Sequence, residues 1–267
     1  MTDHRGMVTF WNPAAETMFG YMTEEVLGQS LLQLIAPVSQ HAHFIGLIQT
    51  NEKPRAGTTS EARAKRLDQS EFPVEISLSS VKFKSHWHTV AIMRDITTRK
   101  ITEERLKQLA TTDPLTNTYN RRYFNEILQN ELSRVQRYNT PLTFIILDID
   151  HFKEVNDTFG HIVGDHVLIQ LSALITTELR DSDVLARWGG EEFTILAPNC
   201  DTACGLQLAE KLRLVIEKTA FPDVGKLTCS FGVTNYHAHD DQHKLIKRAD
   251  DSLYRAKKAG RNRVESS

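Results

Sequence analysis

The chain has 267 residues, of which 40% are hydrophobic and 25% are charged, a composition typical of a globular protein with two ordinary domains. Its formal net charge of −2 gives no general attraction to nucleic acid or to an acidic membrane, so we expect no nucleic-acid partner and expect any anionic ligand to be held by a local site. No apolar run approaches the roughly 18 residues of a membrane span, and the first residues lack the apolar core of a signal peptide, so we expect a cytoplasmic protein without a membrane segment.

Residues 1–97 alternate short strand patterns with loops. The stretch GMVTFWN (6–12) predicts a strand, and AAETMFGYMTEEVLG (14–28) predicts a helix. Two further strand patterns follow, EFPVEISLSSVKF (71–83) and WHTVAIMRDI (87–96). We therefore expect a small α+β domain that closes on an antiparallel sheet.

The charged segment 98–112, TRKITEERLKQLATT, favours a helix. Ile101, Leu106 and Leu109 fall roughly on one face of that helix. We interpret the segment as a helical linker that could form a short two-stranded coiled coil.

Helix and strand patterns alternate from residue 113 to 267, which predicts an α/β domain with a central sheet. The strand PLTFIILDID (141–150) is almost continuously apolar, as in a strand buried on both faces. The expected helices span 121–139, 166–180, 203–218 and 242–258, and the other expected strands span 226–236 and the two halves of 183–198, joined at Gly189-Gly190.

The three cysteines are Cys200, Cys204 and Cys229. An odd and sparse set argues against a disulfide framework and fits a reducing compartment. We interpret Cys200 and Cys204 as packing residues.

The stretch RWGGEEF (187–193) places two glycines and two carboxylates between two predicted strands. A turn with two glycines permits unusual backbone angles and lets a bulky ligand lie against the main chain. The strand 141–150 delivers Asp148 and Asp150 at its carboxyl end, and clustered carboxylates favour a hard cation such as Mg²⁺ or Mn²⁺. Such a metal serves phosphoryl or nucleotidyl transfer. Taken alone, the glycine pair fits a simple surface turn equally well.

Five stretches follow one another along this part of the chain: DPLTNTYNRR (113–122), DIDHFKEVNDTFGHIVGD (148–165), RWGGEEF, TCSFGV (228–233) and ADDSLYRAKKAGRNRV (249–264). Together they resemble the GGDEF family of diguanylate cyclases. The resemblance implies condensation of two GTP molecules into cyclic di-GMP with release of pyrophosphate, on a fold similar to a polymerase palm. Asn117 stands where many relatives have Gly, and because Asn tolerates positive φ we expect its turn to be kept.

The resemblance implies that Asp148, the backbone carbonyl of Ile149, Glu191 and Glu192 hold the metal. Asp148, Glu191 and Glu192 are also the implied catalytic residues. Glu191 is the candidate for helping to deprotonate the attacking 3′-hydroxyl, although activation by the metal alone could do the same.

The resemblance also implies which residues hold the substrate. Asn156 and Asp165 match positions that read guanine, and their amide and carboxylate suit its polar edge. Without the resemblance, they would be interpreted as turn and cap residues.

Further implied substrate contacts involve the phosphates. Lys257 and Arg261, four apart near the end of the last helix and so on one helical face, match phosphate ligands. As an alternative they are a solvated helix end favoured by the dipole. The backbone N–H groups of Phe152 and Lys153 and the turn glycines Gly189 and Gly190 complete the implied substrate site.

Arg180 and Asp183, in RDSD, match the RxxD site at which the family binds its product. Arg presents a planar fork to the Hoogsteen edge of guanine, and the acid can accept from its Watson–Crick edge. We therefore expect inhibition by cyclic di-GMP.

Residues 6–97 resemble a PAS sensor domain, with the first strand of that fold almost absent, so we expect either a fragment or a start placed late. The ligand of this domain stays unknown. His41 and His43 fall near the proximal histidine of haem-binding relatives, which leaves haem as one option among several.

One active site holds one GTP while the product joins two, so we expect a homodimer whose geometry the linker helix transmits. Two alternatives remain open: an inactive domain that acts as a cyclic di-GMP receptor through Arg180 and Asp183, and a structural PAS dimerisation protein.

Overall fold

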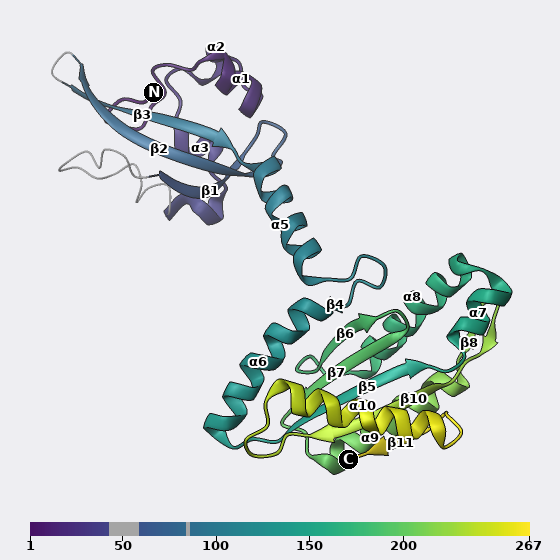
Figure 1. Ribbon diagram of the computed structural model, residues 1–267. Coiled ribbons are helices and arrows are strands. Elements are labelled where there is room, and N and C mark those ends of the chain that lie inside the picture. Colours follow the sequence, from purple (N-terminus) through teal and green to yellow (C-terminus); the bar gives the residue numbers. More distant parts are fainter. Residues whose placement is uncertain (43–58, 84–85) are drawn as a thin grey trace. The chain divides into compact units, whose positions relative to one another are not determined.

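The computed structural model describes residues 1–42, 59–83 and 86–267, so the predicted haem ligand His43 lies outside the described residues. The chain divides into two compact units, residues 1–105 and 106–267 (Figure 1). In the part of the chain that the structure describes, no helix has the length and apolarity needed to cross a bilayer.

The first unit carries short helices beside an antiparallel sheet of strand order β1-β2-β3, which confirms the predicted α+β domain. Its core is formed by residues from the helices and the sheet, among them Phe19, Ile35 and Val74. The elements are α1 (Pro13–Phe19), α2 (Thr23–Val26), α3 (Leu31–Ile35), η1 (Val38–Gln40), β1 (Thr59–Lys65), β2 (Glu71–Phe83) and β3 (His86–Asp95).

Two predictions for this unit are wrong in detail. The helix expected over 14–28 is broken at Gly20, whose left-handed backbone (φ 82°) ends α1 before α2 begins. The strand expected over 6–12 makes only isolated bridges, from Met7 to Ser30 and from Val8 to Thr2. Val8 and Trp11 serve the core and Phe10 is exposed, but none of the three pairs with β1, β2 or β3.

The helix expected over 98–112 is found as α5 (Thr97–Thr111). Its beginning is held to the sheet of the first unit, because Arg99 pairs with Glu61 at 2.7 Å and with Glu75 at 3.1 Å. Lys100 adds a pair with Glu61 at 2.6 Å. These four charges fix the direction in which α5 leaves β1 and β2.

Helix α5 carries the apolar stripe expected from the sequence on an exposed face. Ile101, Leu106 and Leu109 are 63%, 61% and 62% exposed, and none of residues 97–111 is buried. An exposed apolar stripe of this kind is available to another copy of the helix.

The second unit is built on a six-stranded sheet of order β11-β10-β5-β7-β6-β4, which confirms the predicted α/β domain with a central sheet (Figure 1). Neighbouring strands are antiparallel except at the two edges, where β10 runs parallel to β11 and β6 parallel to β4. The strands are β4 (Tyr119–Asn120), β5 (Leu142–Ile149), β6 (Val184–Gly189), β7 (Glu192–Pro198), β10 (Cys229–Asn235) and β11 (Val264–Ser266), with β8 (Ala220–Phe221) and β9 (Gly225–Lys226) as a separate pair.

Five helices accompany this sheet. The four predicted ones are found, and α8 begins five residues earlier than the pattern indicated. The sequence did not predict α7, which is separated from α8 by Gly160 with φ 84°. The helices are α6 (Arg121–Tyr138), α7 (Phe152–Phe159), α8 (His161–Glu178), α9 (Thr202–Lys218) and α10 (Gln242–Lys258).

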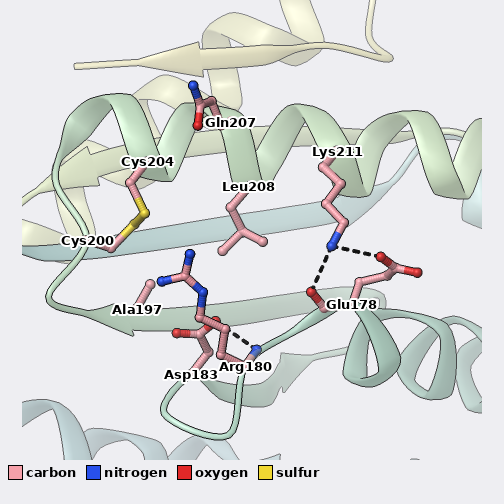
Figure 2. Close-up of a pocket in the computed structure, with 9 residues that line it drawn as sticks. All are labelled: Glu178, Arg180, Asp183, Ala197, Cys200, Cys204, Gln207, Leu208 and Lys211. Carbon is pink, nitrogen blue, oxygen red and sulfur yellow. Dashed lines mark hydrogen bonds and ion pairs between the residues drawn. A yellow bond between two sulfur atoms is a disulfide. The ribbon is translucent and has the colours of Figure 1, made fainter.

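Cys200 and Cys204 form a disulfide, so their interpretation as packing residues is wrong. Asp201 caps α9 by accepting from the backbone N–H of Cys204 at 2.9 Å, which folds the first helical turn back toward Cys200. Figure 2 shows the bond between the two sulfur atoms. The two Cα atoms are thereby 5.4 Å apart, within the span of a disulfide. A count of three cysteines contains no information about this local geometry. Cys229 is free and buried.

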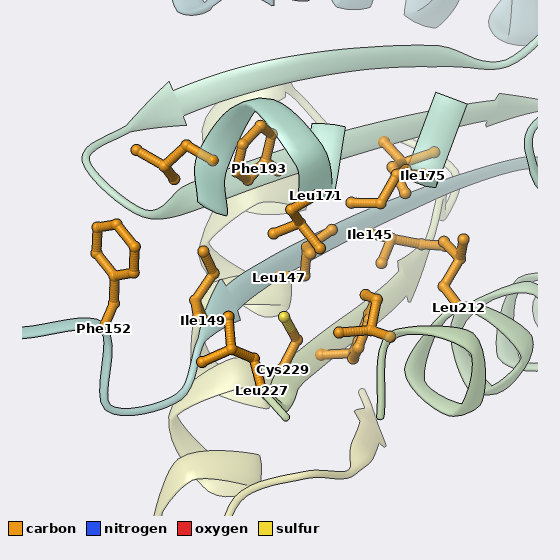
Figure 3. Packing of buried hydrophobic residues seen from close by; sticks show 14 of the residues in the cluster. Ile145, Leu147, Ile149, Phe152, Leu171, Ile175, Phe193, Leu212, Leu227 and Cys229 are labelled. Atoms are coloured by element: carbon orange, nitrogen blue, oxygen red, sulfur yellow. The ribbon is translucent and has the colours of Figure 1, made fainter. Parts of the chain in front are cut away.

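The central strand β5 explains how the second unit positions its site. All eight of its residues are buried. Its odd-numbered side chains, Ile145, Leu147 and Ile149, join one apolar cluster with α8 and α9 (Figure 3). Phe144 and Ile146 join the opposite cluster with α6 and α10. Because strand side chains alternate between faces, Asp148 belongs to the face that α10 covers.

Candidate functional site

The predicted acidic residues come together where β5 ends beside the β6–β7 hairpin. Asp148 lies directly opposite Glu192 in the antiparallel pairing of β5 with β7. Gly189 pairs with Glu192, which leaves Gly190 and Glu191 as the turn. The structure therefore places three predicted acids within one corner of the sheet.

The glycines of this corner face open space. A Cβ atom built on Gly189 or Gly190 would meet no atom within 4 Å. Gly190 also has φ 53°, a left-handed backbone that glycine adopts without strain. The turn can therefore receive a bulky ligand against its main chain, as the sequence indicated.

Lys257 approaches the same corner from the last turn of α10. Its ammonium lies 2.7 Å from Asp148 Oδ2, and the Asp148 side chain is only 8% exposed. The predicted phosphate ligand therefore contacts a predicted metal ligand, as the shared face of β5 and α10 requires.

Burial and neighbouring carboxylates disfavour the ionised form of two acids in this corner, Asp148 and Glu192. Burial raises the pKa of Asp148, Lys257 opposes this rise, and the carboxylates of Glu191 and Asp150 add to it. Burial likewise raises the pKa of Glu192, with Asp148 adding to the rise and Lys257 opposing it. A cation placed among these oxygens would relieve the repulsion.

The carboxylates do not already surround one point. Among residues 1–42, 59–83 and 86–267, no group of three or more His, Cys, Asp or Glu side chains is arranged to hold a metal ion. The donor set nevertheless fits a hard cation, because carboxylate oxygens are the ligands that Mg²⁺ prefers and the repulsion between Asp148 and Glu192 remains only partly offset by Lys257.

The predicted guanine residues lie on two consecutive helices, Asn156 on α7 and Asp165 on α8. A Cβ atom on Gly164 would lie 2.0 Å from Asn156 Oδ1 and 3.3 Å from the Phe152 ring, so only glycine lets α8 approach the Asn156 side chain this closely. Asp165 follows Gly164 and is exposed. The structure thus brings Asn156 beside the turn of α8 that carries Asp165.

Phe152 and Lys153 form the first turn of α7, which starts from His151 in a left-handed conformation (φ 60°). The first N–H groups of a helix have no acceptor within the helix, so they can bind a phosphate oxygen. Phe152 is buried and Lys153 is exposed.

The prediction that Arg261 shares a helical face with Lys257 is wrong. Helix α10 ends at Lys258, and Arg261 follows Gly260 (φ 112°) with its own φ at 62°. The exposed Arg261 lies in a tight turn, so its position relative to Lys257 is set by that turn and not by helical spacing. The spacing of four between Lys257 and Arg261 suggested one helical face, but the chain leaves the helical conformation before it reaches Arg261.

One residue that the sequence did not single out links the corner to the start of the domain. Arg187 donates from Nε to the carbonyl of Gly190 at 2.9 Å and from Nη1 to Asp113 at 3.1 Å. Arg187 and Asp113 lie in the motifs quoted above, but their pairing spans 74 positions, which no local pattern reveals. Next to it, the Arg121 guanidinium lies 4.3 Å from the centre of the Trp188 ring.

Arg180 and Asp183 line a pocket of about 260 Å³ between the α8–β6 loop and α9 (Figure 2). Asp183 accepts from the backbone N–H of Arg180 at 3.1 Å, which closes the loop on itself. Lys211 on α9 pairs with Glu178 at 2.9 Å. The other lining residues are Ala197, Cys200, Cys204, Gln207 and Leu208, so the disulfide forms part of the wall.

In the first unit, a ring nitrogen of His41 lies 3.2 Å from the carbonyl oxygen of Ala36. Of the two histidines predicted as haem ligands, only His41 lies in the described residues, and its ring is already hydrogen-bonded to the main chain. Haem binding stays a prediction.

Comparison with known families matches both units. Residues 110–263 match the family described as diguanylate cyclase, GGDEF domain, and residues 1–96 match the PAS fold.

Two curated relatives are named cyclases. Diguanylate cyclase DgcP of Pseudomonas aeruginosa is 43% identical over 162 residues, which are 60% of this chain and 24% of the relative. Diguanylate cyclase DgcM of Escherichia coli is 38% identical over 175 residues, 66% of this chain and 43% of the relative. The chain thus spans less than half the length of either relative.

Solved structures agree in fold. The coiled coil and GGDEF domain of DgcB from Caulobacter crescentus, in complex with c-di-GMP, superimposes with a TM-score of 0.61 at 30% identity over 64% of this chain and 93% of that one. The active GGEEF domain of a diguanylate cyclase from Vibrio cholerae gives 0.53 at 36% identity over 55% and 96%. With its family match covering more than half of its length, the chain belongs to the family of diguanylate cyclase GGDEF domains, here preceded by a PAS fold.

Proposed function

We propose that this chain is a diguanylate cyclase that condenses two GTP molecules into cyclic di-GMP. The observation that carries the proposal is the corner in which Asp148 faces Glu192 across two strands, with Lys257 at 2.7 Å, beside a glycine turn open to a ligand. The relatives named as cyclases and the active GGEEF domain support it.

The reaction forms two phosphodiester bonds. In each, the 3′-hydroxyl oxygen of one GTP attacks the α-phosphorus of the other, the hydroxyl proton leaves, and pyrophosphate departs with the electrons of the broken bond. Glu191, at the tip of the turn, is the candidate acceptor of that proton.

The residues that would hold Mg²⁺ or Mn²⁺ are Asp148, Glu191, Glu192 and the carbonyl of Ile149. When bound, the ion would offset the charge of the phosphates and help to acidify the attacking hydroxyl. The pKa values of Asp148 and Glu192, raised by burial and by neighbouring carboxylates, support a site that gains from a cation.

GTP would be held at both ends. Asn156 and Asp165 would hydrogen-bond the guanine edge, and the close approach of Gly164 on α8 to Asn156 supports placing both near one base. Lys257, Arg261 and the N–H groups of Phe152 and Lys153 would bind the phosphates, which would lie over the open backbone of Gly189 and Gly190.

Catalysis would require two copies, because each site holds one GTP and the product joins two. The exposed stripe of Ile101, Leu106 and Leu109 on α5 supports pairing of linker helices in a homodimer. In this proposal residues 1–97 sense a signal, 98–112 transmit it and 113–267 turn over GTP. The enzyme would work in the cytoplasm.

The pocket of Arg180 and Asp183 would bind the product and inhibit the enzyme. It does not include any residue of the proposed active site, so a chain without turnover could still use it as a cyclic di-GMP receptor. That second function is the alternative that the experiment below addresses.

The test is to incubate the purified chain with GTP and Mg²⁺ beside a variant carrying Asp148→Ala and Glu192→Ala, and to look for cyclic di-GMP by chromatography. We expect product from the unmodified chain only. A sample shown to be dimeric that binds cyclic di-GMP but makes none would contradict the cyclase and support the receptor.

A further inference from the structure

A second aspartate follows Asp148 at the end of β5 but has a different environment. Asp150 is 4% exposed. Its Oδ1 accepts from the Ser230 hydroxyl at 2.7 Å, and its Oδ2 accepts from the Thr228 hydroxyl at 2.7 Å and from the backbone N–H of Asn262 at 3.0 Å. Three donors hold this carboxylate, so it would have to give them up to bind elsewhere.

The contact with Asn262 reaches the turn that carries Arg261. In that turn Arg261 and Asn262 both have left-handed backbones, with φ 62° and 46°. This conformation is unfavourable for a residue that carries a Cβ atom. A turn of this kind persists only where its surroundings hold it in place.

Other contacts hold the side chain of Asn262 rather than its backbone. Its Oδ1 accepts from Arg213 at 2.9 Å, and its Nδ2 donates to Glu217 at 2.8 Å. On the far side of the turn, the carbonyl of Arg263 accepts from the backbone N–H of Phe231 at 2.9 Å. The exposed Arg261 therefore stands next to an anchored residue, with a second anchor one position further on.

We propose that Asp150 is a positioning residue, whose buried carboxylate fixes the backbone of the 260–263 turn and thereby directs Arg261 toward the phosphates of GTP. This inference rests on the proposed function in one respect, the assignment of Arg261 as a phosphate ligand. It links the strand that supplies Asp148 with the turn that supplies Arg261, so both ends of the phosphate site depend on the end of β5.

The test is a double-mutant cycle on binding of a non-hydrolysable GTP analogue, measured by calorimetry. Asp150→Ala should weaken binding ~10-fold, the size expected when a hydrogen bond to a charged group is lost. In a chain that already carries Arg261→Ala, the same substitution should change binding less than ~2-fold, because residues that act through one another are not additive.

Two variants separate this role from a structural one. Asp150→Asn keeps an acceptor for the Asn262 N–H and should restore most of the affinity. Ser230→Ala removes a donor from the same carboxylate without touching Asn262 and should leave the affinity near that of the unmodified chain. In turnover, Asp150→Ala should raise KM for GTP and change kcat less.

Equal losses from Asp150→Ala with and without Arg261 would overturn the inference, as would a fall in kcat at unchanged KM. An unmodified chain that shows the coupling but makes no cyclic di-GMP would instead contradict the proposed function and leave the positioning role standing.

Discussion

Arg187 bonds the carboxylate of Asp113 at 3.1 Å and the carbonyl of Gly190 at 2.9 Å, so one side chain joins a residue just after the linker helix to the glycine turn. The side chains of Arg187 and Asp113 are mostly buried, at 16% and 20% exposed. The backbone conformation at Gly190 therefore depends on Asp113, a residue outside the corner that β5 forms with the β6–β7 hairpin.

Replacing Arg187→Ala should lower kcat for cyclic di-GMP formation by ~10-fold, as loss of a buried charged hydrogen bond predicts. The turn would lose the donor to Gly190 while the strands on either side keep their pairing. Turnover and thermal unfolding measure the two effects. The matched control is Arg134→Ala, an exposed arginine paired with Glu131 on α6, which should leave both unchanged.

Replacing Glu192→Gln should abolish activity and yet stabilise the metal-free protein at pH 7. Burial and the neighbouring Asp148 raise the pKa of Glu192, so the stability that its neutral form contributes is present at low pH and lost as the pH rises through the folded pKa. Glutamine stays neutral, and the midpoint of thermal unfolding should rise by ~1–2 °C. Melting curves from pH 4 to pH 8 should show the difference fading toward acid pH, and a less stable variant at pH 7 would refute the argument.

Replacing Gly164→Ala should weaken guanine recognition without unfolding the domain. The new Cβ would lie 2.0 Å from Asn156 Oδ1 and must displace that side chain. We expect KM for GTP to rise ~10-fold, the cost of about one specific hydrogen bond to the base, and the preference for GTP over ATP to fall. In a chain carrying Asn156→Ala the glycine substitution should add little, and a full additional loss there would show that the clash acts elsewhere.

Opening the Cys200–Cys204 disulfide should destabilise the second unit. Closing so short a loop contributes about 2 kcal/mol in the chain-entropy account. Urea unfolding with and without a dithiol reductant measures the loss. The Cys204→Ser variant should already be at the lower stability and should not respond to reductant, whereas a response in that variant would show that the effect of the reductant does not come from this disulfide.

Replacing Arg180→Ala should remove inhibition by cyclic di-GMP while KM for GTP stays the same, because the pocket shares no residue with the proposed active site. Initial rates at increasing product concentration test this. Lys218→Ala, which removes an exposed cation from the end of α9 outside the pocket, should remain inhibited like the unmodified chain.

The sequence predicts the elements whose apolar residues are periodic over many positions. Strand β5 and helices α6, α9 and α10 are confirmed because their buried faces follow the period of their own structure. The positive φ of Asn117 (57°) is also as expected, since the local residue type decides it.

What the sequence does not predict depends on contacts between distant residues or on single backbone angles. Gly20 stops a helix that the apolar pattern continued, and the turn after Gly260 takes Arg261 off the helical face that its spacing from Lys257 predicted. The hydrogen bond from Thr228 to Asp150 and the one from Arg187 to Asp113 each join residues more than 70 positions apart. The disulfide depends on a helix cap.

The side chains of β5 alternate between the two faces of the sheet, and this alternation limits which sequence changes the domain can accept during evolution. A shift of one residue in the pairing of β5 would turn Asp148 into the apolar layer under α8 and α9 and would move Leu147 out of that layer. The fold would fail together with the site. Under the proposed function, descendants can therefore lose turnover by replacing Asp148 or Glu192 and still keep a folded domain with the pocket of Arg180 and Asp183 intact, but they cannot lose it by sliding the strand.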